Sequence, residues 1–287
     1  MDPKIAIVTD TNSGISQEQA EAQDIYRMPM PVIVDGETYF EDVSIDPTQF
    51  YFRLRNGADV KTSQPAPGDL IEAWEPLLRR YDEIIYIPMS SGLSGGCGTA
   101  KMLAREYDGR VHVVDNHRIS VTLRQSVMEA KYLADTGKSA EEIVRHLEQD
   151  GMNASIYLAV NTLELLKKSG RVTPAGAAIG TVLQIKPVLQ IQGGKLDAYK
   201  KARGMKAAMT AIIEGLQQDR TVRFAGQPVT IRAAYTGDYE LGEQWRLTLQ
   251  MAFPDLFIEK DPLPLSIACH TGEGALGVGI MRDMWNT

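Results

Sequence analysis

The sequence predicts an α/β protein of two α/β domains, with a doubly wound, mostly parallel sheet in the N-terminal domain and a mixed sheet in the C-terminal domain. Short β-branched apolar runs alternate with helical segments as far as Gly151, which is the rhythm of a doubly wound sheet. After Gly151 the rhythm changes, and Gly193-Gly194 between two extended segments indicates a hairpin. A chain of 287 residues can bury one large core or two modest ones. We therefore expect domains at residues 1–153 and 154–287.

In the N-terminal domain, apolar runs predict the strands, and caps or prolines predict where helices begin. The run 5–8 is followed by Asp10, which is thus expected at the carboxyl edge of the sheet, where capping the next helix is its plainest role. Pro29 and Pro31 cannot donate to a central ladder, so 25–34 is expected to be an edge or irregular strand. The other expected strands are 38–40, 84–87 and 111–115, and the expected helices are 16–24, 46–56, 67–78, one continuing through 101–107, 120–136 and 139–151.

In the C-terminal domain, the pattern is less regular. The expected strands are 155–160, 186–191, 195–199, 229–234, 256–259 and 265–269. The expected helices are 163–168, 175–183, 205–218 and 240–252, and a final loop is expected over 270–277. Residues 175–183 are small and apolar throughout, which is typical of a packed helix rather than a surface helix.

The composition is that of an ordinary globular protein and argues against several functional classes. Charged residues make up 23% and hydrophobic residues 44% of the chain. A formal net charge of −7 argues against nucleic acid as a partner. The longest apolar runs fall well short of the roughly 20 residues that cross a bilayer, and the N-terminus enters a strand pattern without a signal sequence. Two cysteines and four scattered histidines give no disulfide framework and no metal-site spacing. We expect a cytoplasmic location and no metal.

A Ser/Gly loop after the 84–87 strand is compatible with two chemistries. Its serines, its backbone N–H groups and the following helix start suit a phosphate or a carboxylate. The loop also contains G-x-S-x-G around Ser94, and with Asp238 and His270 the chain has the Ser…Asp…His order of an α/β-hydrolase. Against a hydrolase, residues 88–91 separate the strand from the first glycine, whereas a nucleophile elbow needs the strand to enter it directly.

Other candidate residues have plain structural roles to weigh against function. Thr62, in T-S-Q-P, suits a helix N-cap, and Arg203, in K-K-A-R, suits a solvated strand end. His270 suits a satisfied loop histidine, although its glycine-rich neighbours permit close approach of a ligand. Cys269 is expected to be a small buried hydrophobe at a strand end rather than a nucleophile.

Seven motifs taken together resemble the DegV family of bacterial fatty-acid-binding proteins over essentially the whole chain. They are V-T-D-T (8–11), T-S-Q-P (62–65), S-S-G-L-S-G (90–95), L-K-K-S-G-R-V (166–172), I-K-P (185–187), K-K-A-R-G (200–204) and H-T-G-E-G-A-L-G (270–277). Seven motifs in the right order are far more specific than any one of them.

The resemblance implies a long-chain fatty acid, such as palmitate, in a tunnel between the two domains, with no other cofactor. By the matching motifs, Thr62 and Ser94 would hydrogen-bond the carboxylate and His270 would lie beside it. Some family members are the acyl-carrying subunit of a two-part fatty acid kinase, whose ATP-binding subunit phosphorylates the bound carboxylate for phospholipid synthesis. The resemblance therefore implies a kinase partner, with Arg203 near an acyl-phosphate and Arg171 near the partner-facing surface.

The chemistry of these residues agrees with a carboxylate that must later be modified. Hydrogen bonds from Arg would be about twice as strong as those from neutral hydroxyls and would hold the anion too well. At about 0.8 kcal/mol per methylene, burying a palmitate-length tail offers on the order of 10 kcal/mol before ordering costs. The 177–183 run and the 205–213 segment are candidate tunnel walls, with core packing as the alternative. Glu273 stands where the family usually has proline and adds an acid near the head group.

We therefore expect a fatty-acid carrier that is not itself an enzyme, with no nucleic-acid partner and no transmembrane segment, able to contact a membrane transiently. Two alternatives remain: a serine hydrolase that uses Ser94 and His270, and a stand-alone lipid carrier or sensor without a kinase partner.

Overall fold

The fold was determined as a computed structural model, which describes residues 3–178 and 185–285. The chain divides between Met152 and Asn153 into two compact units, which we call the first and the second unit. A parallel sheet lies in the first unit and a mixed sheet in the second, so the predicted α/β class is confirmed.

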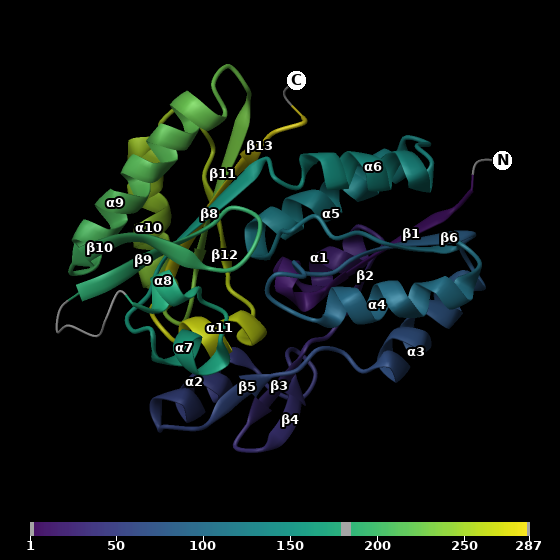
Figure 1. The fold of residues 1–287 in the computed structure, drawn as a ribbon, viewed down its shortest axis with the longest axis horizontal. Coiled ribbons are helices and arrows are strands. Elements are labelled where there is room, and N and C mark those ends of the chain that lie inside the picture. Colours follow the sequence, from purple (N-terminus) through teal and green to yellow (C-terminus); the bar gives the residue numbers. More distant parts are fainter. Residues whose placement is uncertain (1–2, 179–184, 286–287) are drawn as a thin grey trace. The chain divides into compact units, whose positions relative to one another are not determined.

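The first unit is built on a four-stranded sheet in the order β2-β1-β6-β7, with every neighbouring pair parallel (Figure 1). The strands are β1 (Ile5–Asp10), β2 (Ile25–Met28), β6 (Glu83–Ile87) and β7 (Val111–Val113). The strands are short apolar runs, and buried residues alternate between the two faces of the sheet. Because all four strands run in one direction, the loops after β1, β6 and β7 meet at the same edge.

Helices cover both faces of this sheet, which is the doubly wound arrangement. Ile85 and Ile87 of β6 pack in one cluster with α1 (Gln17–Ala22), α5 (Ser120–Asp135) and α6 (Ala140–Asp150). The alternate residues Ile84 and Tyr86 pack in a second cluster with Trp74 of α3 and with α4. These two helices span Pro67–Leu78 and Gly96–Ala104. Short 3-10 turns follow β1 (η1, Thr11–Ser13) and α4 (η2, Arg105–Tyr107).

A small antiparallel sheet of order β4-β3-β5 also belongs to the first unit. Its strands are β3 (Pro31–Val34), β4 (Glu37–Phe40) and β5 (Val60–Thr62), and helix α2 (Pro47–Arg55) connects β4 to β5. The single irregular strand expected over 25–34 is thus two strands in two different sheets, β2 and β3. Pro29 and Pro31 flank the break, because neither proline can donate a ladder hydrogen bond.

The second unit contains a six-stranded sheet in the order β10-β9-β8-β13-β11-β12. Its neighbours are antiparallel except for the parallel pair of β11 and β12. The strands are β8 (Ala154–Ala159), β9 (Ile185–Ile191), β10 (Asp197–Arg203), β11 (Val229–Tyr235), β12 (Glu259–Pro262) and β13 (Leu276–Arg282). The helices are α7 (Glu164–Ser169), α8 (Pro174–Ala177), α9 (Met205–Gln218), α10 (Tyr239–Ala252) and α11 (Leu265–Thr271), with a π-helical turn η3 (Asp219–Arg223) after α9.

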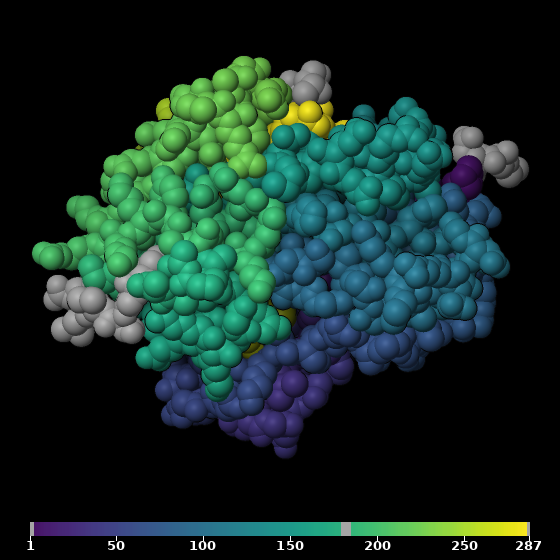
Figure 2. All heavy atoms as spheres, viewed as in Figure 1, coloured from purple at the N-terminus to yellow at the C-terminus, as the bar shows by residue number. Residues whose placement is uncertain are grey.

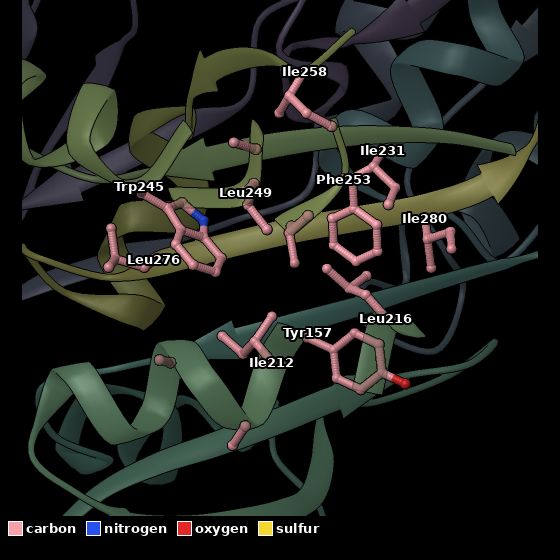
Figure 3. Packing of buried hydrophobic residues seen from close by; sticks show 14 of the residues in the cluster. Tyr157, Ile212, Leu216, Ile231, Trp245, Leu249, Phe253, Ile258, Leu276 and Ile280 are labelled. Carbon is pink, nitrogen blue, oxygen red and sulfur yellow. The ribbon is translucent and has the colours of Figure 1, made fainter. Parts of the chain in front are cut away.

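The core of the second unit lies between its sheet and the helices α9 and α10. Figure 3 shows Trp245, Leu249 and Phe253 of α10 and Ile212 and Leu216 of α9 gathered with side chains from β8, β11 and β13. The indole of Trp245 donates to the carbonyl of Gly277 (2.7 Å), so the largest side chain of this core is also hydrogen-bonded.

The segment after residue 262 differs from the prediction in two ways. The strand expected over 265–269 is the helix α11, which begins directly after Pro264. A short apolar run does not distinguish a buried strand from a buried helix, and Pro264 is pre-set for a helix start. The end of the expected loop 270–277 opens strand β13, which lies between β8 and β11. The sequence pattern did not indicate strand β13, because its glycines disfavour an isolated strand.

Other elements differ from the expected bounds by a few residues. Strand β10 continues to Arg203, and β12 begins at Glu259, where the expected strand 256–259 ends.

Two segments were expected as candidate tunnel walls. In the 205–213 segment, Ala208, Ala211 and Ile212 are buried in the core, so core packing describes it better than a tunnel wall. The outer side of α9 forms part of the green surface in Figure 2. Of the expected helix 175–183, residues 179–183 lie outside the described residues.

Candidate functional site

The Ser/Gly loop connects β6 to α4 at the carboxyl edge of the parallel sheet and is closed on itself by Ser90. The hydroxyl oxygen of Ser90 accepts from the N–H of Gly92 (3.1 Å), and its carbonyl accepts from the N–H groups of Leu93 (3.0 Å) and Ser94 (3.2 Å). Ser90 is buried, so this serine is a structural centre of the loop and is not exposed to a ligand.

The start of the loop is held by groups on both neighbouring strands. The carboxylate of Asp10, at the end of β1, accepts from the N–H of Met89 (2.9 Å). The carboxylate of Asp115, after β7, accepts from the N–H of Ser91 (3.2 Å), and the carbonyl of Arg118 accepts from the N–H of Ser90 (2.8 Å). Because the N–H groups of Met89, Ser90 and Ser91 donate within the first unit, these three amides form no nest for an anion.

Ser94 is the hydroxyl of the loop best placed to donate to a ligand. It is half-buried, and its oxygen accepts from the N–H of Gly96 (3.1 Å) at the first residue of α4. Because the oxygen already accepts, the hydroxyl can act outward as a donor. Over residues 3–178 and 185–285, no group accepts its proton.

The fold brings the T-S-Q-P segment against this loop. A Cβ added to Gly95 would lie 2.9 Å from the side-chain oxygen of Gln64, so a larger residue there would force the two segments apart. Gln64 also donates to the hydroxyl of Thr99 on α4 (3.0 Å). Thr62 is the last residue of β5, two residues before Gln64, and is half-buried. Thr62 and Ser94 thus lie on adjoining segments of the first unit, and Thr62 is in a strand rather than at a helix N-cap.

In the second unit, His270 lies in the last turn of α11, next to Arg171. Burial, and to a smaller extent the positive charge of Arg171, lower the pKa of His270 to about 4. His270 is consequently neutral at physiological pH and can donate or accept a hydrogen bond without adding a charge. Arg171 follows α7, and its guanidinium donates to the carbonyl of Ser169.

The H-T-G-E-G turn that follows His270 is held by two residues that the sequence did not single out. The buried Thr236 donates its hydroxyl to the carbonyl of Gly272 (2.7 Å) and accepts from the N–H of Ala275 (2.8 Å). The amide of Asn161 donates to the carbonyl of Glu273 (2.9 Å). No residue pattern marks either role, because both partners lie far from the turn in sequence.

Glycine is required within this turn. Gly274 has a φ of +77°, and a Cβ there would lie 2.4 Å from the amide nitrogen of Asn161. The side chain of Glu273 lies over Gly237, where an added Cβ would come within 2.6 Å of it. The acid Glu273 thus packs on the turn before α10.

Two cations lie at one end of the β9–β10 hairpin. The register pairs Arg203 with Ile185 and Ala202 with Lys186. Lys186 donates to the side-chain oxygen of Asn161 (2.8 Å), which links the I-K-P segment to the H-T-G-E-G turn. Arg203 is exposed at the last position of its strand, as expected for a strand-end cation.

The local geometry does not favour a serine hydrolase. Ser94 has no positive φ, whereas a nucleophile elbow holds its serine on a sharp, strained turn. The carboxylate of Asp238 caps α10 by accepting from the N–H groups of Glu240 (2.7 Å) and Leu241 (3.2 Å). The charge that acts on His270 is the cation Arg171, whereas a triad histidine is oriented by an acid.

The cysteines are not reactive groups in this structure. Both are buried, and burial raises the pKa of Cys97 to about 11. Cys269 is buried as expected, although it lies in helix α11 and not at a strand end. Across the part of the chain that the structure describes, no three His, Cys, Asp or Glu residues are grouped so that they could hold a metal ion.

The helices are also too short or too polar for a bilayer. Within the described ranges, none has the length and the apolar character to cross a membrane.

Comparison with known proteins identifies a family that covers nearly the whole chain. The family whose model matches, over residues 4–283, is described as an uncharacterised protein of the DegV family. A DegV domain-containing protein from Deinococcus radiodurans is 32% identical over 280 residues, which cover 96% of this chain and 98% of the relative.

Two solved structures have the same fold along their whole length. A DegV family protein from Thermus thermophilus that binds a fatty acid is 29% identical, with a TM-score of 0.88 over 98% of this chain and 100% of its own. DegV from Bacillus subtilis, a fatty acid binding protein, is also 29% identical, with a TM-score of 0.86 over the same shares of the two chains.

The surroundings of His270 predict its titration. We expect the ring to remain neutral down to about pH 5, because burial and Arg171 disfavour the imidazolium. The exchange Arg171→Met should raise the pKa only part of the way to its ordinary value, since burial, the larger cause, remains. Heteronuclear NMR of the four histidine rings, with His270→Gln to identify the resonance, measures both values. A wild-type pKa near 6.5 would contradict this account.

The same shift has a consequence for stability. The pKa of His270 is lower in the folded chain than in the unfolded chain, so the unfolded state binds more protons between about pH 4 and 6.5. The contribution of His270 to the free energy of unfolding is therefore present above pH 6.5 and lost as the pH falls towards 4. Between pH 7 and pH 5, the free energy of unfolding of His270→Gln should fall less than that of the wild type. Urea unfolding at the two pH values measures both changes.

Proposed function

Because the chain belongs to the DegV family, we propose that it binds a long-chain fatty acid whose carboxylate is held by Thr62, Ser94 and His270. The observation that carries the proposal is the hydroxyl of Ser94, which accepts from Gly96 and keeps its proton for an acceptor. Two solved relatives that bind fatty acids share the fold over nearly the whole chain, which supports the same ligand class here.

The proposed donors are uncharged, and this suits a carrier. Thr62 and Ser94 are neutral hydroxyls, and the lowered pKa of His270 keeps its ring neutral as well. Neutral donors orient a carboxylate but hold it about half as strongly as cationic donors do. Affinity would then come mainly from burial of the acyl tail, while the head group sets its position.

The proposal extends to a partner that uses the carboxylate. An ATP-binding kinase subunit would transfer the γ-phosphoryl group: a carboxylate oxygen forms a bond to the γ-phosphorus, the bond from that phosphorus to the bridging oxygen breaks, and ADP leaves. The exposed Arg203 would lie near the acyl-phosphate, and Arg171 would lie near the partner-facing surface. On this proposal the chain is the acyl carrier and the partner is the catalyst, and the carrier would act in the cytoplasm with transient membrane contact.

The direct test is the ligand itself. Protein purified under native conditions should release a long-chain fatty acid on solvent extraction, identified by mass spectrometry, at up to one per chain. Delipidated protein should take up added palmitate. A chain that carries no acyl group and takes none up would refute the proposal, and labelling of Ser94 by a fluorophosphonate probe would favour the hydrolase instead.

The head-group residues are tested by single exchanges. Thr62→Ala and Ser94→Ala should each weaken fatty-acid binding by roughly 1–3 kcal/mol, because each leaves a buried acceptor without its donor. Ser63→Ala is a matched control, since Ser63 is exposed beside Thr62 and should bind as the wild type does. The measurement is displacement of a fluorescent fatty acid. Unchanged binding in both head-group variants would remove these residues from the site.

The partner is tested separately from the ligand. With a cognate ATP-binding subunit and ATP, the loaded protein should form an acyl-phosphate, trapped as the hydroxamate. Arg203→Ala should lower that rate and leave fatty-acid binding intact, because Arg203 is proposed to face the partner. Binding without any acyl-phosphate would support the stand-alone carrier or sensor.

A further inference from the structure

The loop that carries Ser94 is held by two carboxylates of different character. Strand β6 lies between β1 and β7, so its loop meets Asp10 on one side and Asp115 on the other. Asp10 is buried and accepts a hydrogen bond from the N–H of Met89. Asp115 lies nearer the surface and accepts one from the N–H of Ser91. Both carboxylates accept a backbone hydrogen bond from the loop, but in different surroundings.

Three neutral N–H donors converge on the carboxylate of Asp10. One oxygen accepts from the N–H of Met89 (2.9 Å), and the other accepts from the backbone (2.9 Å) and side-chain (3.0 Å) nitrogens of Asn12. Only an ionised carboxylate can accept on both oxygens without presenting a donor of its own. The position is therefore built for the anion, although it is buried at 2% exposure.

We propose that Asp10 is a positioning residue for ligand binding: its carboxylate fixes Met89, and through Ser90 the turn that presents Ser94, and protonation of Asp10 loosens that turn and lowers ligand affinity. This inference rests on the proposed carboxylate-binding role of Ser94. The connection is short, since Ser90 follows Met89 and its carbonyl accepts from the N–H of Ser94.

Protonation is within reach of physiological pH at Asp10 and not at Asp115. Burial raises the pKa of Asp10 to about 6, against the hydrogen bonds from Met89 and Asn12. At Asp115 burial opposes ionisation too, but the hydrogen bonds from Ser91 and the contribution of His117 lower the pKa. Between pH 5 and 8 Asp115 therefore stays ionised while Asp10 changes state.

The other titratable groups near Asp10 keep one state over that range. The charge of Asp10 acts on the Tyr86 hydroxyl of β6 and on the Cys97 thiol of α4, and burial, as the larger cause, raises the pKa of both. Both groups are neutral below pH 8. In the second unit, the pKa of the proposed ligand residue His270 is about 4, so its ring does not change state above pH 5 either.

Protonation of Asp10 does not unfold the protein, so unfolding through this group cannot explain a loss of affinity in acid. Its pKa is higher in the folded chain than the ordinary value of 3.8, so the folded state binds more protons between about pH 4 and 6. Through this group alone, the free energy of unfolding rises as the pH falls through 6, whereas the proposed affinity falls. The two readouts have opposite signs, which separates positioning from stability.

The test compares Asp10→Asn with Asp115→Asn. An amide has one acceptor oxygen, so in Asp10→Asn an NH2 group must face either Met89 or Asn12, and the loop is loosened at every pH. Binding of a fluorescent long-chain fatty acid is measured from pH 5 to 8, with thermal melting at each pH. Wild-type affinity should fall about 10-fold on acidification, with a midpoint near pH 6. Asp10→Asn should bind weakly throughout without that inflection, and Asp115→Asn should bind more weakly but keep it.

Each outcome decides the inference. An Asp10→Asn protein that keeps the wild-type pH profile overturns it, because the inflection then belongs to the ligand or to another group. A wild type that binds no fatty acid at any pH overturns both this inference and the proposed function. If Asp10→Asn does not fold, the backbone amide resonance of Met89 in the wild type should shift with a midpoint near pH 6. A Met89 resonance that does not move is contrary to the inference.

Discussion

The hydrogen bonds that hold the loop after β6 are the constraint on which the position of Ser94 depends. In the turn at Met89–Ser91, consecutive N–H groups have to be satisfied where the sheet ends. Asp10, at the end of β1, and Asp115 and Arg118, in the segment after β7, accept from them. Arg118 ties this arrangement to α6, because its guanidinium donates to the carbonyls of Asp150 (2.7 Å) and Gly151 (3.2 Å) at the end of that helix. A turn fixed in this way uses its own amides and the hydroxyls of Ser90 and Ser91 internally, and it positions the hydroxyl of Ser94.

In the second unit, neutral side chains hold the backbone of the turn after His270. The turn after His270 is fixed by the hydroxyl of Thr236 and the amide of Asn161, each of which bonds to backbone carbonyls of the turn. Lys186 donates to the side-chain oxygen of Asn161 and so supports the same turn. His270, at the end of α11, is kept uncharged by burial and by Arg171. Each unit thus holds uncharged hydrogen-bonding groups, Thr62 and Ser94 in the first and His270 in the second, and neutral donors suit the carboxylate ligand proposed above.

The parts of the fold with strong local signals were predicted well. Helix 205–218 and helix 67–78 have the expected bounds, and the alternation of strands with helices predicted the parallel sheet. The errors fall where local signals conflict with tertiary packing. Strand β13 contains Gly277, which disfavours an isolated strand, yet a Cβ there would lie 3.4 Å from Leu158 and 3.5 Å from Ala234. Neighbouring strands supply the packing that glycine cannot, and no local pattern records them.

The sequence by itself determined the α/β class, the family and the motif residues Thr62, Ser94, Arg171, Arg203 and His270, because motif order and hydrophobic periodicity are properties of the chain alone. Tertiary structure decided which of the buried polar groups support those residues. Asp10 and Asp115 lie more than a hundred positions apart and meet one loop because parallel strands end at a common edge. In the folded chain burial raises the pKa of Asp10, whereas the hydrogen bonds from Ser91 and the contribution of His117 outweigh burial at Asp115 and lower its pKa. Two aspartates that look alike in the sequence are different acids in the fold.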